Sequence, residues 1–221
     1  MNDAIYLHSQ AAGIWESNYT KRAFSVRKDI LRDLLAASDL KGQNWLDAGC
    51  GTGTLARFLA EYKGCRVLGV DASEAMISHC IPHRNTDFRQ IGDIGETGLP
   101  DAAFDGVLCS SVLEYVSDPG AALLELRRVL KQNGVLLVSL PNSDPIAWFP
   151  IVTAHRLTKY LGPWRMCGYL DYVKHRYSES GFRRLLGGCG FRVEAVRTYG
   201  GVRGFPILRR GTLMMFRAVK L

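Results

Sequence analysis

The sequence predicts an α/β fold: a Rossmann-like sheet of seven strands, mostly parallel, with helices on both faces. From about residue 44 onward, short apolar runs alternate with helical segments, an order typical of a doubly wound sheet. A glycine-rich turn, DAGCGTG at residues 47–53, follows the first of these runs and opens a helix. The last two runs, FRVEAVRTY and TLMMFRAVKL, leave no room for a helix between them. We therefore expect the last strand to be antiparallel.

Each expected element has local signals of its own. Helices are expected over 11–37, 54–63, 73–80, 118–134 and 178–190, and strands over 44–49, 65–71, 87–93, 104–111, 135–141, 191–199 and 212–221. Ser73, Asp118 and Ser178 are residue types that cap helix N-termini, and Asn133-Gly134 is a typical helix stop. This pattern predicts an N-terminal helical arm or lid over 1–43, a ligand-binding core over 44–142, a helical cover inserted after strand five over 143–177, and the C-terminal part of the sheet over 178–221.

The expected cover contains IAWFPIVTAHRLTKYLGPWRMC, residues 146–167. From Pro150, a helix of about eleven residues would place Ile151, Ala154, Leu157 and Leu161 on one face, and His155, Arg156 and Lys159 on another. Such a helix is too short to cross a bilayer. We expect it to lie over a substrate, and contact with a membrane surface is an alternative that the sequence leaves open.

Composition is that of one globular domain: 221 residues, of which 47% are hydrophobic and 22% charged. The net charge of +7 is uneven, because residues 1–154 carry 14 Lys and Arg against 18 Asp and Glu, whereas residues 155–221 carry 14 against 3. The basic C-terminal third indicates either a surface for anionic ligands or lipid headgroups, or a merely solvated face. The sequence does not separate these two readings.

Cysteine spacing and the N-terminus bear on the compartment. The six cysteines form no CxxC pair and no cluster with zinc-ligand spacing, so we expect reduced thiols and no metal. The N-terminal residues lack the apolar segment of a signal peptide. The expected location is cytoplasmic, and peripheral contact with a membrane is the alternative.

Three acidic residues follow three successive strands and indicate a nucleoside ligand. Asp47 lies in the glycine-rich turn, and Asp71 ends the second strand, where an acid can accept both ribose hydroxyls. Asp93 follows the third strand and could accept from an adenine amine. The Lys-Ser/Thr pair of a triphosphate loop is absent, since Thr54 and Leu55 follow the glycines. S-adenosylmethionine, which carries no polyphosphate, fits these residues best.

The segments WLDAGCGTG, GVDAS, GDI, FDGVLCSSVLEYVSDP and LKQNGVLLVSLPN, in this order, resemble the class I S-adenosylmethionine-dependent methyltransferases. The resemblance runs from about Asn44 to Asn142. It implies S-adenosylmethionine as cofactor, S-adenosylhomocysteine as product and no metal. The cofactor-binding residues that it implies are Asp47, Gly49, Gly51, Gly53, Asp71, Ala72, Met76, Asp93, Ile94 and Ser110.

Candidate catalytic residues depend on the acceptor, because a sulfonium methyl is already activated and a base is needed only where the acceptor must lose a proton. His155 and His175 are candidate bases in the cover. Tyr115 stands where many relatives have the histidine of Leu-Glu-His-Val, which leaves a base role there in doubt, and Tyr177 precedes a helix. The candidate substrate-binding residues are Trp15, Tyr19, Trp148 and Arg176.

The expected acceptor is a small molecule, since the strand-four turn lacks the motifs of nucleic-acid base methylases and aromatic-basic RNA-binding signatures are absent. The cover and YSESGFRRLLGGCGF are loosely similar to quinone-biosynthesis O-methyltransferases and to magnesium-porphyrin methyltransferases. We therefore expect methyl transfer to an oxygen atom of a hydrophobic small molecule, which can be neutral or anionic. Carbon or nitrogen methylation of a natural-product scaffold is the alternative, and cofactor binding without transfer is a third hypothesis. The oligomeric state stays open.

Overall fold

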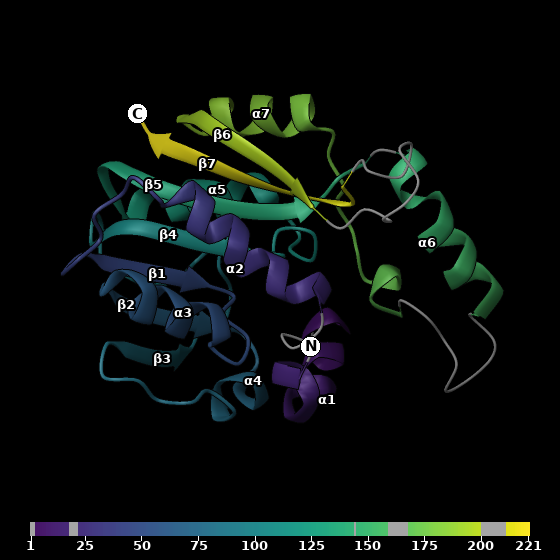
Figure 1. The fold of residues 1–221 in the computed structure, drawn as a ribbon, viewed down its shortest axis with the longest axis horizontal. Coiled ribbons are helices and arrows are strands. Elements are labelled where there is room, and N and C mark those ends of the chain that lie inside the picture. The colour runs from purple at the N-terminus through teal and green to yellow at the C-terminus, as the bar shows by residue number, and fades with distance from the viewer. Residues whose placement is uncertain (1–2, 18–21, 144, 159–167, 200–210) are drawn as a thin grey trace.

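The computed structural model describes residues 3–17, 22–143, 145–158, 168–199 and 211–221 (Figure 1). Its helices are α1 (Asp3–Trp15), α2 (Arg22–Leu34), α3 (Thr54–Lys63), α4 (Glu74–Ser78), α5 (Pro119–Val129), α6 (Pro145–Thr158), the 3₁₀ helix η3 (Gly168–Asp171) and α7 (Glu179–Gly188). Its strands are β1 (Asn44–Ala48), β2 (Arg66–Asp71), β3 (Thr86–Gln90), β4 (Phe104–Ser110), β5 (Leu130–Pro141), β6 (Phe191–Tyr199) and β7 (Leu213–Lys220).

The sheet has the order β3-β2-β1-β4-β5-β7-β6. Neighbouring strands from β3 to β5 are parallel, while β7 pairs antiparallel with both β5 and β6. The expected seven-stranded, mostly parallel sheet with an antiparallel last strand is therefore confirmed. The chain order reverses between β1 and β4, so a ligand site is expected beyond the carboxyl ends of these two strands.

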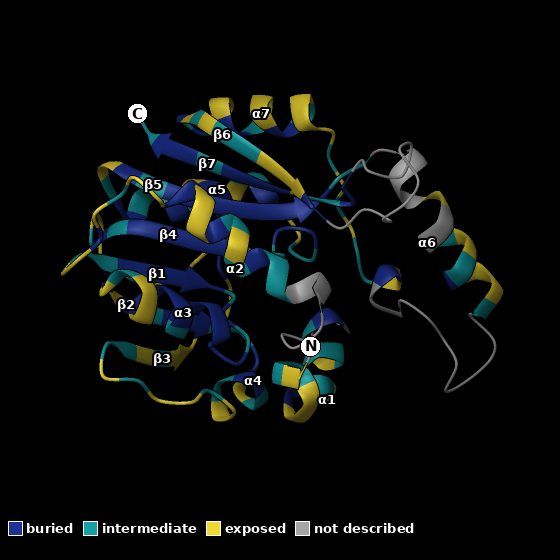
Figure 2. Cartoon of the chain, in the orientation of Figure 1, coloured by how far each residue is buried: buried dark blue, intermediate teal, exposed yellow. Residues whose placement is uncertain are grey.

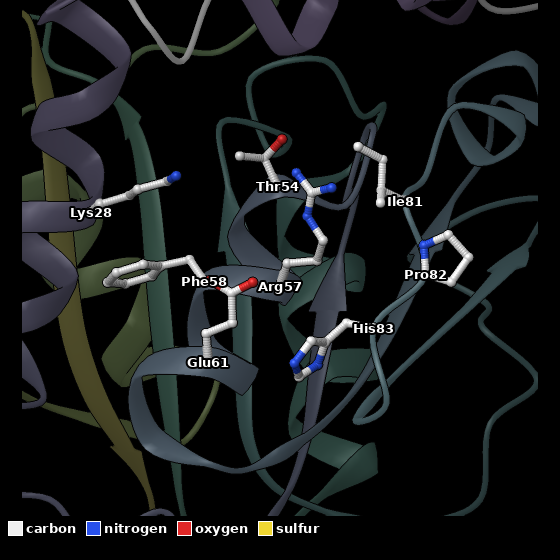
Figure 3. A pocket seen from close by; sticks show the side chains of 8 residues that line it. All are labelled: Lys28, Thr54, Arg57, Phe58, Glu61, Ile81, Pro82 and His83. Carbon is white, nitrogen blue, oxygen red and sulfur yellow. The ribbon is translucent and has the colours of Figure 1, made fainter.

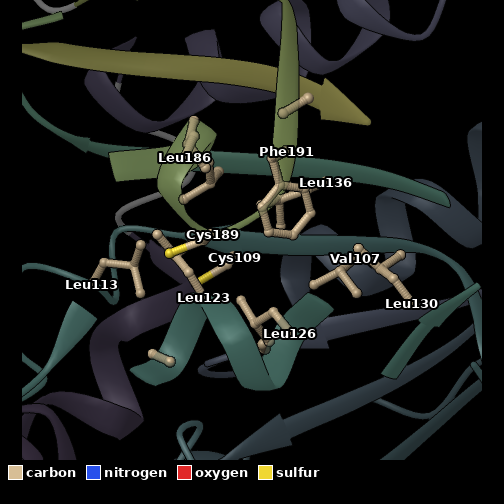
Figure 4. Close-up of a cluster of buried hydrophobic side chains, with 14 of the residues drawn as sticks. Val107, Cys109, Leu113, Leu123, Leu126, Leu130, Leu136, Leu186, Cys189 and Phe191 are labelled. Carbon is tan, nitrogen blue, oxygen red and sulfur yellow. The ribbon is translucent and has the colours of Figure 1, made fainter. Parts of the chain in front are cut away.

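Helices cover both faces of the sheet, and each face has its own apolar core (Figure 1). Figure 4 shows one core, in which α5 and α7 pack on the sheet through buried side chains that include Leu123, Leu126 and Leu186. On the other face, Leu31 and Leu34 of α2 belong to the core that also contains residues of α3. Figure 2 shows the central strands as the most buried part of the molecule. This rigid sheet fixes the positions of the loops at its carboxyl edge.

Three helices begin at the polar residues that the sequence indicated. The Ser73 hydroxyl accepts the backbone N–H of Met76, and the Ser178 hydroxyl accepts that of Gly181, both at 3.1 Å. The Asp118 carboxylate accepts the N–H groups of Gly120 and Ala121 at 2.8 and 3.0 Å. These contacts satisfy donors that an uncapped helix end leaves without a partner.

Two helix predictions were wrong in extent. The single helix expected over 11–37 is two helices, α1 and α2, and α1 begins eight residues earlier, at Asp3. The helix expected to stop at Asn133-Gly134 ends at Val129, because Leu130 already pairs with Phe104 of β4. Asn133 has φ +61°, so this dipeptide makes a turn within β5 rather than a helix stop.

The expected cover contains a longer helix than its sequence suggested. Helix α6 begins at Pro145, five residues before Pro150. Figure 1 shows α6 beyond the end of the sheet at which the arrowhead of β5 lies. Leu157 is 73% exposed whereas His155 is 8% exposed, so here the apolar residue faces solvent and the polar residue is buried. His155 is buried because it contacts Asp171 of η3. Leu161 and Lys159 lie outside the described residues. Among the helices described, none is long and apolar enough to cross a membrane.

Candidate functional site

Three glycines form the turn between β1 and α3. Gly49, Gly51 and Gly53 have φ values of +78°, +55° and +73°, a backbone region that side chains with a Cβ rarely adopt. A Cβ at Gly49 would lie 2.2 Å from Val112, and one at Gly53 would lie 2.5 Å from Phe88. Both the positive φ values and the close packing of Val112 and Phe88 therefore require glycine at these positions of the turn.

Asp71 holds this turn from the neighbouring strand. Its Oδ2 accepts the backbone N–H of Gly51 at 2.8 Å, and its Oδ1 accepts that of Ser73 at 2.9 Å. Burial raises the pKa of Asp71, and the two N–H donors oppose that rise. Asp71, which the sequence predicts to bind the ribose, thus lies at the carboxyl edge of the sheet, next to the glycine turn, as expected.

Asp47 is the most buried acid of the site. Only 2% of it is exposed, and its Oδ2 has no hydrogen-bond partner. Burial, and then the nearby charge of Asp71, raise the pKa of Asp47 to about 7. Two acids at one place, one with an oxygen lacking a donor, favour a cationic or hydrogen-donating ligand group.

The predicted adenine residues occupy the next loop along the edge. Ile94 is 6% exposed and Met76 is 2% exposed, so both pack in the protein. Asp93 is exposed, and its Oδ1 accepts the N–H of Gly95 at 2.8 Å. Ala72 is half-buried beside Asp71, and its carbonyl accepts from Gln90 at 3.3 Å. Their roles toward adenine remain predictions.

Helix α1 lies against the glycine turn and α4. The Ser9 and Ser73 hydroxyls are 2.7 Å apart, and a Cβ at Gly51 would lie 3.3 Å from the indole Nε1 of Trp15. Glu16, just after α1, forms an ion pair with Arg57 of α3. Part of the predicted N-terminal lid therefore reaches the predicted cofactor loop, with Trp15 beside it. Tyr19 lies outside the described residues.

The candidate bases are in two separate places. His155 Nε2 lies 3.0 Å from Asp171 Oδ1, within the cover. His175 Nε2 lies 3.0 Å from the carbonyl oxygen of Val116, so it contacts the segment that follows β4, and its ring is 6.4 Å from that of Tyr177. The structure thus brings His175 and Tyr177 together and leaves His155 with η3.

The other predicted residues are spread along the same edge. Ser110 ends β4, and its hydroxyl is 3.1 Å from that of Ser139 on β5. Tyr115 follows in the next turn, where its ring is 5.1 Å from that of His8. Arg176 is exposed. Trp148 belongs to α6, but its side chain lies outside the described part of the chain.

Sequence reasoning missed a buried polar cluster of Arg27, Ser111, Glu114 and Tyr199. The Arg27 guanidinium donates to the Ser111 hydroxyl at 3.0 Å and to the Tyr199 hydroxyl at 3.3 Å. Burial raises the pKa of Glu114 to about 8, although the Arg27 charge lowers it, and Glu114 Oε2 has no partner. Ser111 has φ +58°, a strained conformation for serine. Glu114 was visible as an acid within the apolar SVLEYV, whereas nothing in the sequence singled out Arg27.

A separate groove of about 190 Å³ lies between α2, α3 and the segment after α4. Figure 3 shows its lining, which includes Lys28, Arg57, Phe58, Glu61 and His83. None of the predicted site residues lines it. Among the residues that the structure describes, no group of three or more His, Cys, Asp or Glu is arranged to hold a metal ion.

Comparison with known proteins relates this chain to one family. A family model described as a methyltransferase domain matches residues 19–196. A malonyl-[acyl-carrier protein] O-methyltransferase from Serratia marcescens is 37% identical over 132 residues, 59% of this chain and 49% of that protein. A ubiquinone biosynthesis O-methyltransferase from Pseudomonas fluorescens is 33% identical over 129 residues, 56% of this chain and 55% of that protein. The chain spans about half the length of these curated relatives.

A solved structure extends the comparison to almost the whole chain. A SAM-dependent methyltransferase from Thermotoga maritima superimposes with a TM-score of 0.71 at 19% identity, covering 98% of this chain and 99% of that one. At that identity the likeness concerns the fold alone.

Proposed function

We propose, since the chain belongs to the family of methyltransferase domains, that it transfers the methyl group of S-adenosylmethionine to an oxygen of a hydrophobic small molecule. The observation that carries this proposal is a glycine turn with positive φ values beside two acids. Asp71 is hydrogen-bonded to Gly51, and the buried Oδ2 of Asp47 lacks a donor. A ligand with an ammonium group and a ribose supplies what these groups lack.

The residues present fit that cofactor. Asp71 retains lone pairs for ribose hydroxyls while it holds the turn, and Asp47 provides negative charge for an ammonium group. Gly49, Gly51 and Gly53 all have positive φ values, which give the turn the tight backbone conformation against which we propose that the methionine part lies. We propose Ile94 and Met76 as the apolar residues that pack beneath the base, since both are buried, and Asp93 as the acceptor for its amine.

The bound cofactor would supply an electrophilic methyl group. The chain's own contribution is then to orient an acceptor oxygen beyond the carboxyl ends of β1 and β4 and to exclude water. We propose that helix α1 and the described elements of the expected cover, α6 and η3, do so; Figure 1 shows α1 and α6 near that end of the sheet. An acceptor carboxylate needs no base. A phenol does, and His175, Tyr177, Tyr115 and His155 are the candidate groups.

Oxygen as the acceptor atom is supported by the two curated relatives, both named as O-methyltransferases. A hydrophobic acceptor is supported by the apolar composition of α6, and an anionic one by Arg176 and the basic C-terminal third. We further propose that the protein is cytoplasmic, with peripheral membrane contact through the exposed Phe149 and Leu157 of α6 as the alternative. Nucleic acid is not among the partners proposed.

One labelled-methyl experiment separates methyl-ester formation, N-methylation and cofactor binding without transfer from one another. Purified protein is incubated with methyl-labelled S-adenosylmethionine and a solvent extract of cell metabolites, and both S-adenosylhomocysteine and extractable label are measured. Label that mild alkali releases as methanol indicates a methyl ester, and alkali-stable label that stays neutral indicates an ether or a C-methyl product. Label that partitions into acid indicates N-methylation. Cofactor binding without any S-adenosylhomocysteine would contradict the transferase function and leave the binding hypothesis.

A further inference from the structure

Three aromatic rings meet at the edge of the proposed cofactor site. The imidazole of His8 lies 5.2 Å from the indole of Trp15 and 5.1 Å from the phenol ring of Tyr115. Both pairs are edge-to-face, at 84° and 75°. His8 and Trp15 belong to α1, whereas Tyr115 belongs to the turn after β4, so the cluster joins the N-terminal helix to the core.

The cluster stands next to the acids and the glycine turn. Trp15 is the nearest side chain to the position of a Cβ on Gly51, and the charge of Asp71 acts on His8. Tyr115 reaches the cluster from the carboxyl end of β4. The rings therefore lie beside both the glycine turn and the β4 turn, next to the place where we propose that the methionine part of the cofactor binds.

His8 is held as a neutral ring. Its Nδ1 lies 2.8 Å from the carbonyl oxygen of Ala4. Burial lowers the pKa of His8, more than the Ala4 contact and the Asp71 charge raise it. A neutral imidazole adds no positive charge to the cluster. Three uncharged rings beside an acid form a surface that attracts a cation.

We propose that His8, Trp15 and Tyr115 recognise the positive sulfonium of the cofactor and thereby favour the methyl-carrying form over the product. This inference rests on the proposed function. S-adenosylmethionine and S-adenosylhomocysteine share the adenosine, ammonium and carboxylate groups, and they differ in a methylated, charged sulfur against a neutral thioether. Contacts from Asp71, Asp47 and the glycine turn would contribute equally to the binding of both molecules. A cation–π contact would strengthen the binding of the charged S-adenosylmethionine alone.

The test is the ratio of the two dissociation constants, Kd for S-adenosylhomocysteine divided by Kd for S-adenosylmethionine, measured by calorimetry at neutral pH. In Tyr115→Leu and Trp15→Leu, loss of a ring is expected to lower this ratio about fivefold. The matched variants Tyr115→Phe and Trp15→Phe keep a ring and are expected to keep the ratio within about twofold. His8→Lys adds a charge, and it is expected to weaken the methyl-carrying ligand more than the product.

Each outcome has a defined meaning. A purely structural role would weaken both ligands together, so an unchanged ratio in the leucine variants and in His8→Lys would overturn the proposal. Circular dichroism and thermal unfolding report whether each variant folds. Where a leucine variant does not fold, His8→Gln, which removes one ring of the cluster, replaces it and is also expected to lower the ratio. Failure of the wild-type protein to bind either ligand would instead overturn the proposed function, and the sulfonium proposal with it.

Discussion

The carboxylate of Asp71 accepts the backbone N–H of Gly51 at 2.8 Å, which joins the end of β2 to the turn after β1. Besides its proposed role as a ribose ligand, Asp71 therefore also fixes the loop on which we propose that the methionine part lies. We expect Asp71→Ala to weaken S-adenosylmethionine binding at least tenfold, since it removes a charge-assisted contact to the ligand and loosens the loop. Isothermal titration calorimetry measures the change.

The matched control for this substitution is Asp87→Ala. Asp87 is an exposed acid on β3 that forms an ion pair with Arg89 at 3.2 Å and accepts the backbone N–H of Phe88 at 3.0 Å. Its removal is expected to leave cofactor affinity unchanged. Equal affinity in Asp71→Ala and the wild type would contradict the assignment of Asp71 to the ribose.

Asp47 gives a prediction about pH. Its pKa is about 7 in the folded protein, above the ordinary value of 3.8, so between these values the folded state binds more protons than the unfolded state. Stability of the ligand-free protein should therefore fall as pH rises from about 4 to 7, by at most about 1.4 kcal/mol per pH unit from this group. Glu114, with a pKa of about 8, acts in the same direction.

The variant Asp47→Asn tests this directly. Thermal unfolding between pH 5 and 7.5 should show a smaller decline in Tm for Asp47→Asn than for the wild type, and a higher Tm at pH 7.5. The same variant should bind S-adenosylmethionine more weakly, because it lacks the negative charge for the ammonium group. A variant less stable than the wild type at pH 7.5 would show that ionised Asp47 is stabilised in the fold by a group other than those identified.

Arg27 links α2 to the turn after β4 and to the end of β6. Because it is 8% exposed and donates to Ser111 and Tyr199, Arg27→Leu leaves two hydroxyls with fewer partners and removes the charge beside Glu114. We expect a loss of about 2 to 4 kcal/mol in the free energy of unfolding, measured with urea. Arg27→Lys should recover little of it, because an ammonium group lacks the guanidinium fork. Arg183→Gln, at an exposed pair with Glu179, is the control and should cost under about 0.5 kcal/mol.

The sheet could be predicted from sequence because its signals are local. Ser73, Asp118 and Ser178 act through contacts two or three residues away, and the apolar strand runs reflect burial on both faces. The end of α5 could not be predicted in the same way. Asn133-Gly134 is a turn signal in any context, and only the pairing of Leu130 with Phe104 makes it a turn inside a strand.

The acids and glycines of the site were likewise readable, since each follows a strand directly. Arg27 was not, because its role depends on Ser111 and Tyr199, which are distant in sequence and reach it only through the fold. The burial of His155 has the same origin. Its helical position predicted a polar face, but its contact with Asp171 covers it.

A final prediction concerns residues 91–103, which join β3 to β4 without a helix. Glu125 of α5 holds this segment, accepting from the backbone N–H and the hydroxyl of Thr97 at 2.8 and 2.5 Å. Arg128 donates to Glu125 at 2.7 Å and to the Leu99 carbonyl at 2.7 Å. The Arg128 guanidinium is the main cause that lowers the pKa of Glu125 to about 2.

The pKa of Glu125 lies below the ordinary 4.5 in the folded protein. The stability that the ionised Glu125 contributes is therefore present above about pH 4.5 and is lost as pH falls toward 2. Glu125→Gln should therefore cost about 1 to 2 kcal/mol at pH 7, a figure reduced for the partial exposure of Arg128. The difference between variant and wild type should shrink at pH 3. Urea unfolding at the two pH values measures it, with Asp87→Asn as the exposed control. A difference that stays constant with pH would mean that Glu125 acts through shape and hydrogen bonding rather than through its charge.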